Sequence, residues 1–161
     1  MFDLRVVSVC IALASGAASA QEAQVAFGSV KADPTLPVEV TSETLNVNQA
    51  DGSAEFLGNV IVIQGEMRLS AERVLVIYNE DRSAIQRLEA TENVVLVSPP
   101  DAAEGDRAEY TIDTGVIRMN GNVLLTQGPS VISGDQMVAN LTSGTATMTG
   151  RVKTILQPGD N

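Results

Sequence analysis

The chain has 161 residues, a formal net charge of -10, no histidine and no tryptophan. An acidic surface repels phosphate backbones, and three phenylalanines and two tyrosines are too few for a base-stacking surface, so nucleic acid is excluded as a partner. Without histidine, and with Cys10 as the single cysteine, Ser-His and Cys-His nucleophiles and a histidine-based zinc site are excluded.

Residues 1–20 have the features of a cleaved signal peptide. Arg5 provides a weakly positive start, Val6–Ala14 is a short apolar core, and Ala18–Ala20 reads Ala-Ser-Ala, which fits an A-x-A cleavage site. The uncharged stretch is shorter than the roughly 20 apolar residues that cross a bilayer. We therefore predict an exported, soluble mature chain that begins at Gln21.

The mature chain is predicted to be all-β. Residues 21–36 are small and polar, without periodicity, and are expected to form a flexible lead-in. From Pro37 to Pro158 apolar and polar residues alternate, which is typical of strands with one buried face, and turn signals such as Asp51-Gly52 separate the runs. This pattern predicts eight antiparallel strands, no helix, and a disordered tail over residues 159–161.

A tripeptide of similar sequence recurs along the chain. Its copies are Gly58-Asn59-Val60, Glu92-Asn93-Val94, Gly121-Asn122-Val123 and Gly150-Arg151-Val152. Two of the copies continue into a Gln-Gly pair, at Gln64-Gly65 and Gln127-Gly128. Such repeats mark supersecondary units that bury their apolar faces by stacking on their neighbours. We therefore expect function along the length of an array rather than at one catalytic point.

Carboxylates are the only remaining option for acid–base catalysis. Most acids fall at turns or alternate outward from the apolar positions, as Glu39, Glu72 and Glu109 do, which is typical of a solvated face. We therefore predict no enzyme activity, no metal and no cofactor.

The apolar face has an unusual composition for a dry core. A sandwich filled by its own side chains explains most such faces. Here large aromatic residues are scarce, while methionines such as Met67 and Met119 and strand glycines such as Gly58 and Gly121 recur. Methionine adapts to irregular guests, and a strand glycine often marks close approach to the backbone, so this face has room for a ligand.

Several segments resemble, in the same order, the OstA-like domain family of LptA-type lipopolysaccharide transport proteins. They are Pro37–Glu43, Phe56–Gly65, Leu69–Val74, Gly105–Tyr110 and Met119–Gly128. The resemblance covers about Pro37 to Pro158. It implies an open, V-shaped antiparallel β-jellyroll whose apolar trough holds lipopolysaccharide acyl chains, and whose copies join end to end across the periplasm.

The resemblance and the alternation together predict the trough. The resemblance implies that five residues occupy positions that contact lipid in the family: Val38, Val40, Leu96, Tyr110 and Ile112. The alternating apolar positions extend this lipid-binding trough to Phe56, Val60, Val62, Leu69, Val74, Val76, Met119, Val123, Leu125 and Met137. Because the chain and the lipid phosphates are both anionic, affinity should come from acyl chains, at about 0.8 kcal/mol per buried methylene.

The resemblance also implies the partners. They are lipopolysaccharide through its lipid A acyl chains, further copies of the chain, an LptC-type jellyroll at the inner membrane and an LptD-type jellyroll at the outer membrane. The expected function is that of a periplasmic carrier, one part of the bridge that moves lipopolysaccharide from the inner to the outer membrane.

The two ends of the sheet are predicted to attract each other. An open sheet leaves unpaired backbone groups on its first strand, near Val38–Val47, and its last, near Thr145–Leu156. The charges predicted at these self-association edges are Glu39 and Glu43 on the first strand and Arg151 and Lys153 on the last. Unlike edges that meet head to tail do not close a ring, so we expect open oligomers that grow with concentration.

Three alternatives stay open from the sequence. The first is an LptC-type homologue that keeps its N-terminal segment as a membrane anchor, against which the Ala-Ser-Ala site argues. The second is a structural β-solenoid without lipid cargo. The third, and the last in order, is a carboxylate-dependent hydrolase.

Overall fold

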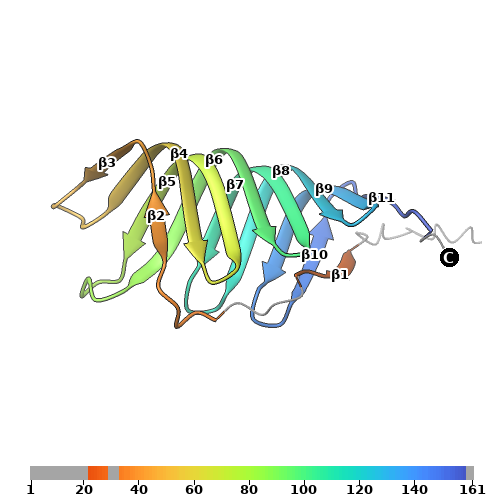
Figure 1. The fold of residues 1–161 in the computed structure, drawn as a ribbon, viewed down its shortest axis with the longest axis horizontal. Coiled ribbons are helices and arrows are strands. Elements are labelled where there is room, and N and C mark those ends of the chain that lie inside the picture. The colour runs from red at the N-terminus through yellow and green to blue at the C-terminus, as the bar shows by residue number, and fades with distance from the viewer. Residues whose placement is uncertain (1–21, 29–32, 159–161) are drawn as a thin grey trace, which may run out of the picture.

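The computed structural model describes residues 22–28 and 33–158, and these residues form strands and no helix, which confirms the all-β prediction. The strands are β1 (Ala23–Ala26), β2 (Glu39–Thr41), β3 (Thr44–Val47), β4 (Ala54–Gln64), β5 (Met67–Tyr78), β6 (Ile85–Ser98), β7 (Asp101–Thr111), β8 (Val116–Gln127), β9 (Ser130–Asn140), β10 (Thr145–Thr149) and β11 (Lys153–Ile155). They form one open antiparallel sheet in the order β1-β10-β9-β8-β7-β6-β5-β4-β2, with β3 also paired to β4 and β11 to β9 (Figure 1).

The repeated tripeptides are bends in the strands. Gly58 and Asn59 have positive φ angles of 80° and 45°, and Gly121 and Asn122 have 82° and 49°. The pairing register shifts at both places, as it does around Glu92-Asn93, so each pair is a bulge that bends its strand. Glycine and asparagine tolerate this left-handed conformation better than other residues, which explains why the Gly-Asn pair recurs.

The row of bends divides the sheet into two walls. Wall 1 consists of β2, β11 and the parts of β4–β9 next to the turns at 65–66, 99–100 and 128–129. Wall 2 consists of β1, β3, β10 and the remaining parts of β4–β9, next to the turns at 79–84, 112–115 and 141–144. Inward side chains of both walls form one apolar cluster, so the walls face each other across a common interior.

The structure refines the prediction of eight strands. Each of the long strands β4–β9 is present as predicted, but the first and last predicted strands are each broken at the bend. Ser42-Glu43 separates β2 from β3, and Gly150-Arg151-Val152 separates β10 from β11, because the sheet turns from one wall to the other there.

The structure also differs from the predicted flexible lead-in. Ala23–Ala26 form β1, which pairs with β10, and Phe27 is buried in the apolar cluster. The prediction of a flexible segment was wrong for these residues because pairing with β10 supplies order that the local composition does not indicate. The predicted signal peptide, residues 1–20, and the predicted tail, residues 159–161, lie outside the described residues.

Candidate functional site

All fifteen residues predicted for the trough lie in or against one apolar cluster. Those that wall 1 contributes from its long strands are Val60, Val62, Leu69, Leu96, Val123 and Leu125. Those that wall 2 contributes are Val74, Val76, Tyr110, Met119 and Met137. All eleven are at most 1% exposed, so the interior they form is shielded from water in this conformation.

The other four predicted residues lie at the margins of this interior. Val38, Val40 and Phe56 are half-buried and pack against the cluster from the β2–β4 end of the sheet. Ile112 is 8% exposed and follows β7 at the turn of wall 2. The predicted set therefore extends from one end of the interior to its open side.

Sequence reasoning missed several residues of the interior. The clearest group is a set of small side chains that face inward: Ala54, Ala71, Ala90, Ala103, Ala108, Ala139 and Ala146. Alanine is only weakly hydrophobic, so the alternating pattern identifies the larger apolar residues of these strands as inward-facing and does not identify the alanines. Phe27 was missed because it lies within residues 21–36, the predicted flexible lead-in, although Val25 and Phe27 alternate as strand residues do.

A hydrogen bond joins the free ends of the two walls. The Tyr110 hydroxyl, near the turn of wall 2, donates to Gln64 Oε1, near the turn of wall 1, at 2.7 Å. We call this pair the latch. Burial raises the pKa of the Tyr110 phenol to about 12, so the hydroxyl stays protonated and keeps donating at neutral pH.

Buried polar groups cluster on the same rim of wall 1. The buried polar side chains among the described residues are Gln64, Ser98 and Asp101, each beside a turn of wall 1. The Asp101 carboxylate accepts from the backbone N–H of Gly28 at 2.8 Å and from Gln127 Nε2 at 3.1 Å. The interior is therefore apolar along its length and polar only at the open side of the V, which suits a ligand with long apolar chains and a polar head.

Acidic side chains cap the bends. Asn122 Nδ2 donates to Asp106 Oδ2 at 2.9 Å, and Arg151 Nη2 lies 2.6 Å from Asp135 Oδ1. Asn59 Nδ2 donates to Glu43 in the same way. The hydrogen bond from Arg151 is the main reason why the pKa of Asp135 lies below its ordinary value. In each pair the two residues are 16 positions apart in the sequence, and together the pairs hold the row of bends.

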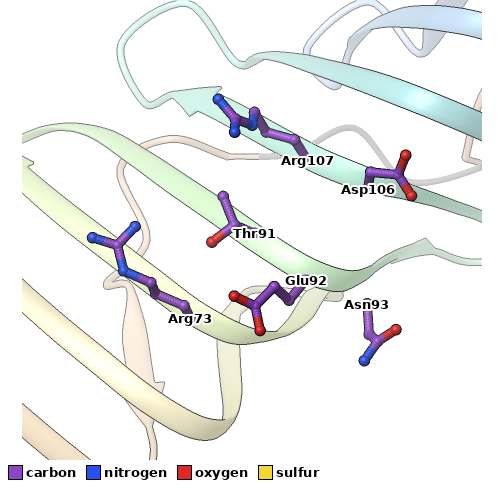
Figure 2. A pocket seen from close by; sticks show the side chains of 6 residues that line it. All are labelled: Arg73, Thr91, Glu92, Asn93, Asp106 and Arg107. Atoms are coloured by element: carbon purple, nitrogen blue, oxygen red, sulfur yellow. The ribbon is translucent and has the colours of Figure 1, made fainter.

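A polar hollow of about 650 Å³ lies at the outer side of this row. It is lined by Arg73, Thr91, Glu92, Asn93, Asp106 and Arg107, whose side chains project from β5, β6 and β7 (Figure 2). Arg73 is already engaged by Glu55, with Nε and Oε1 2.6 Å apart. Charged groups of both signs do not match an alkyl chain, so the candidate lipid site is the interior and not this hollow.

The ends of the sheet carry exposed apolar side chains. Leu45 and Val47 on β3 are 52% and 64% exposed, and Ile155 and Leu156 at β11 are 50% and 73% exposed. Contiguous exposed apolar residues on edge strands indicate surfaces that pair with another chain.

The four charges predicted for these edges occupy two kinds of position. Glu39 on β2 and Lys153 on β11 lie on the opposite edge strands of wall 1. Glu43 and Arg151 lie instead in the bends, where Asn59 and Asp135 engage them. β10, which was predicted as part of the last edge, is paired with β1 and is therefore not an edge strand.

Residues 22–28 and 33–158 contain neither a candidate metal site nor a helix that could span a membrane. No group of three or more His, Cys, Asp or Glu side chains is placed to hold a metal ion. No helix in this part of the chain is long and apolar enough to cross a membrane.

Comparison with known proteins identifies the family. Residues 39–153 match the family described as LptA/(LptD N-terminal domain) LPS transport protein. An uncharacterized protein of Rhizobium meliloti (strain 1021) is 27% identical in an alignment of 125 residues that covers 73% of this chain and 67% of the relative.

A solved structure shares the fold. The crystal structure of LptH, the LptA homologous periplasmic component of the lipopolysaccharide transport device of Pseudomonas aeruginosa, matches with a TM-score of 0.71 at 15% identity, covering 79% of this chain and 99% of that one. The likeness confirms the open β-jellyroll that the sequence predicted. With the family match over residues 39–153, it leads to one conclusion: this chain belongs to the LptA/LptD N-terminal domain family of lipopolysaccharide transport proteins.

Proposed function

We propose that this chain is a periplasmic carrier that holds the acyl chains of lipopolysaccharide between its two walls and forms part of the bridge from the inner to the outer membrane. The observation that carries the proposal is the continuous apolar interior, to which every long strand from β4 to β9 contributes buried side chains from both walls. The LptH likeness supports the periplasmic location, since that relative is a periplasmic component of lipopolysaccharide transport.

The chemistry of the interior favours acyl chains over the head group. Lipopolysaccharide phosphates are anionic and the chain has a formal charge of -10, so electrostatics opposes binding of the head group. Burying methylenes contributes about 0.8 kcal/mol each, which makes a few acyl chains sufficient for tight binding. The polar rim at Gln64, Ser98 and Asp101 lies where a head group would leave the interior.

The ends of the sheet support joining to further jellyroll domains. Wall 1 ends in β2 and β11, and wall 2 ends in β3 and β1, so each wall offers one free strand at either end. A second copy, an LptC-type domain or an LptD-type domain can add strands to these edges and prolong the apolar interior. Lipid would then pass from one jellyroll to the next without entering water.

Lipid analysis of the purified protein tests the proposal. Protein made in a lipopolysaccharide-producing host and purified without detergent should release lipid A on extraction, detected by mass spectrometry. Ile112→Asp, which puts a charge at the margin of the interior, should abolish loading, whereas Thr111→Asp on the outward-facing neighbour should retain it. Circular dichroism checks that both variants fold.

The opposite outcome is equally clear. Folded wild-type protein that contains no lipid, and that takes up none from purified lipopolysaccharide, would identify a structural β protein with a dry core instead.

A further inference from the structure

The N-terminal strand holds the two walls together at their free ends. The segment 22–28, which we call the strap, contains β1 and runs beside β10 at one end of the sheet (Figure 1). The backbone N–H of Phe27 donates to the carbonyl of Gly144, in a turn of wall 2, at 2.9 Å. The next residue, Gly28, donates to Asp101 in wall 1 at 2.8 Å. Two successive residues therefore bridge the open side of the V.

The repeated Gln-Gly pairs of the sequence act at this open side. Gln127 Nε2 donates to the carbonyl of Ala26 in the strap. Gln64, at the same place in the other copy of the repeat, donates to the carbonyl of Leu36 at 2.9 Å and accepts from Tyr110 in the latch. Both glutamines end a strand of wall 1 just before its turn, so each fastens a piece of the N-terminal chain to the rim.

Phe27 fills part of the apolar interior. It is 1% exposed and is among the largest fully buried side chains of the described residues. Phe27 directly follows β1, a four-residue strand at the end of the sheet order. Its side chain therefore reaches the interior from outside the long strands β4–β9. Gly28 fits closely against Ser98, whose side chain a Cβ at position 28 would meet.

We propose that the strap is a releasable closure of the trough: Phe27 occupies interior space that an alkyl chain takes when it binds, and the strap leaves the rim to admit that chain. The inference rests on the proposed function. A four-residue edge strand, held by few hydrogen bonds, belongs to the least stable part of a fold and can open without global unfolding. The latch and the long strands then keep the jellyroll intact while the strap is displaced.

A reversible disulfide tests the closure. Ala26 and Thr145 are register partners on β1 and β10. Because Phe27 and Gly144 form the neighbouring hydrogen-bonded pair, Ala26 and Thr145 form a non-hydrogen-bonded pair, whose Cα separation of about 4.5 Å suits a disulfide. The double variant Ala26→Cys/Thr145→Cys, made in the mature chain without Cys10, fixes the strap when oxidised and frees it when reduced.

The matched control is Val138→Cys/Thr147→Cys. These residues are register partners on β9 and β10, within wall 2. Thr147 also lies opposite Gln24 of the strap, so this disulfide is formed beside the strap but does not link it to β10. Uptake of a fluorescent sixteen-carbon fatty acid and of purified lipopolysaccharide is measured for both variants, oxidised and reduced. We expect uptake to slow at least tenfold in the oxidised strap variant alone, and to recover on reduction.

The outcomes separate this inference from the proposed function. Equal uptake by the oxidised and reduced strap variants would overturn the closure and leave the carrier function standing. No uptake by any form, wild type included, would overturn both. As a second measurement, Phe27→Ala should speed fatty-acid uptake while unfolding remains cooperative; unchanged uptake by this folded variant would contradict the role of Phe27.

Discussion

Tyr110 and Gln64 show how polar groups are kept inside an apolar trough. Both side chains are buried, and each satisfies the other, while Gln64 also binds the carbonyl of Leu36. Among the described residues no buried side-chain nitrogen or oxygen lacks a partner. Because the two buried side chains are hydrogen-bonded, they fix the relative position of the two walls with little loss of folding free energy. A buried polar group without a hydrogen-bond partner would destabilise the fold by about 1 to 3 kcal/mol.

The raised pKa of Tyr110 predicts a loss of stability at alkaline pH. The folded protein holds the phenol proton up to a pKa of about 12, whereas the unfolded chain releases it near 10. Stability from this group is therefore complete below pH 10 and is lost as pH rises through 12, with about 1 kcal/mol gone by pH 11. Urea titrations of the wild type and of Tyr110→Phe between pH 8.5 and about 11.5 measure this loss of folding stability.

The Tyr110→Phe variant serves as the control because it lacks the titrating group and keeps the ring. The stability difference between wild type and variant should shrink as pH rises. A difference that stays constant up to pH 11.5 would show that the Tyr110 phenol is not buried as described.

At the scale of the elements, the bends depend on which residues occupy the repeat. Gly121 has φ of 82°, and a Cβ there would meet the side chain of Asp106, which caps the bend. Gly128 also has positive φ, 54°, but a Cβ there would meet nothing within 4 Å. A side chain at either position would therefore strain the backbone in the same way, but only at position 121 would it also collide with a neighbouring side chain.

This difference predicts unequal effects of alanine. Gly128→Ala should cost about 1 kcal/mol from the left-handed backbone alone, and Gly121→Ala should cost at least 1 kcal/mol more because the cap is displaced. Chemical denaturation of both variants measures the two values. Equal losses would mean that the acidic caps do not hold the bends.

The sequence predicted the strands better than their breaks. Alternation places β4–β9 because each strand has one apolar face along its whole length, and the repeat points to regular units. It does not show that the Gly-Asn pair bends the strand, because an alternating pattern resumes beyond it. Nor could it find β1, whose order comes from pairing with β10, far along the chain. The latch was equally hidden, since Gln64 and Tyr110 are 46 residues apart and meet only when the walls fold together.

For the whole molecule, the two ends of wall 1 carry opposite charges. Glu39 lies on β2 and Lys153 on β11, so in the head-to-tail contact that we propose between copies these two residues would approach each other. Arg151 is the poorer edge charge because Asp135 already engages it. An exposed pair contributes only about 0.2 to 1 kcal/mol, so backbone pairing and the exposed apolar residues should supply most of the affinity.

Charge reversal at these ends should alter self-association. We predict that wild-type oligomers grow with concentration, as measured by light scattering; Lys153→Glu should weaken this growth, and adding Glu39→Lys should restore it. Arg118→Glu makes the same charge change on the exposed face of β8, in the middle of the sheet, and should leave association as in the wild type. Identical scattering from Lys153→Glu and Arg118→Glu would refute a charge-matched end-to-end contact.

Photo-crosslinking to lipopolysaccharide tests the central claim, a lipid trough between two walls, most directly. A photoreactive side chain is placed in turn at the inward-facing positions Val40, Leu96 and Ile112, and at the outward-facing positions Glu39, Thr111 and Asp113. Because side chains alternate between the two faces of a strand, Glu39 is the outward neighbour of Val40, while Thr111 and Asp113 flank Ile112 in the sequence. We predict lipopolysaccharide adducts at the inward positions and none at the outward ones, whereas equal labelling of both faces would contradict the trough.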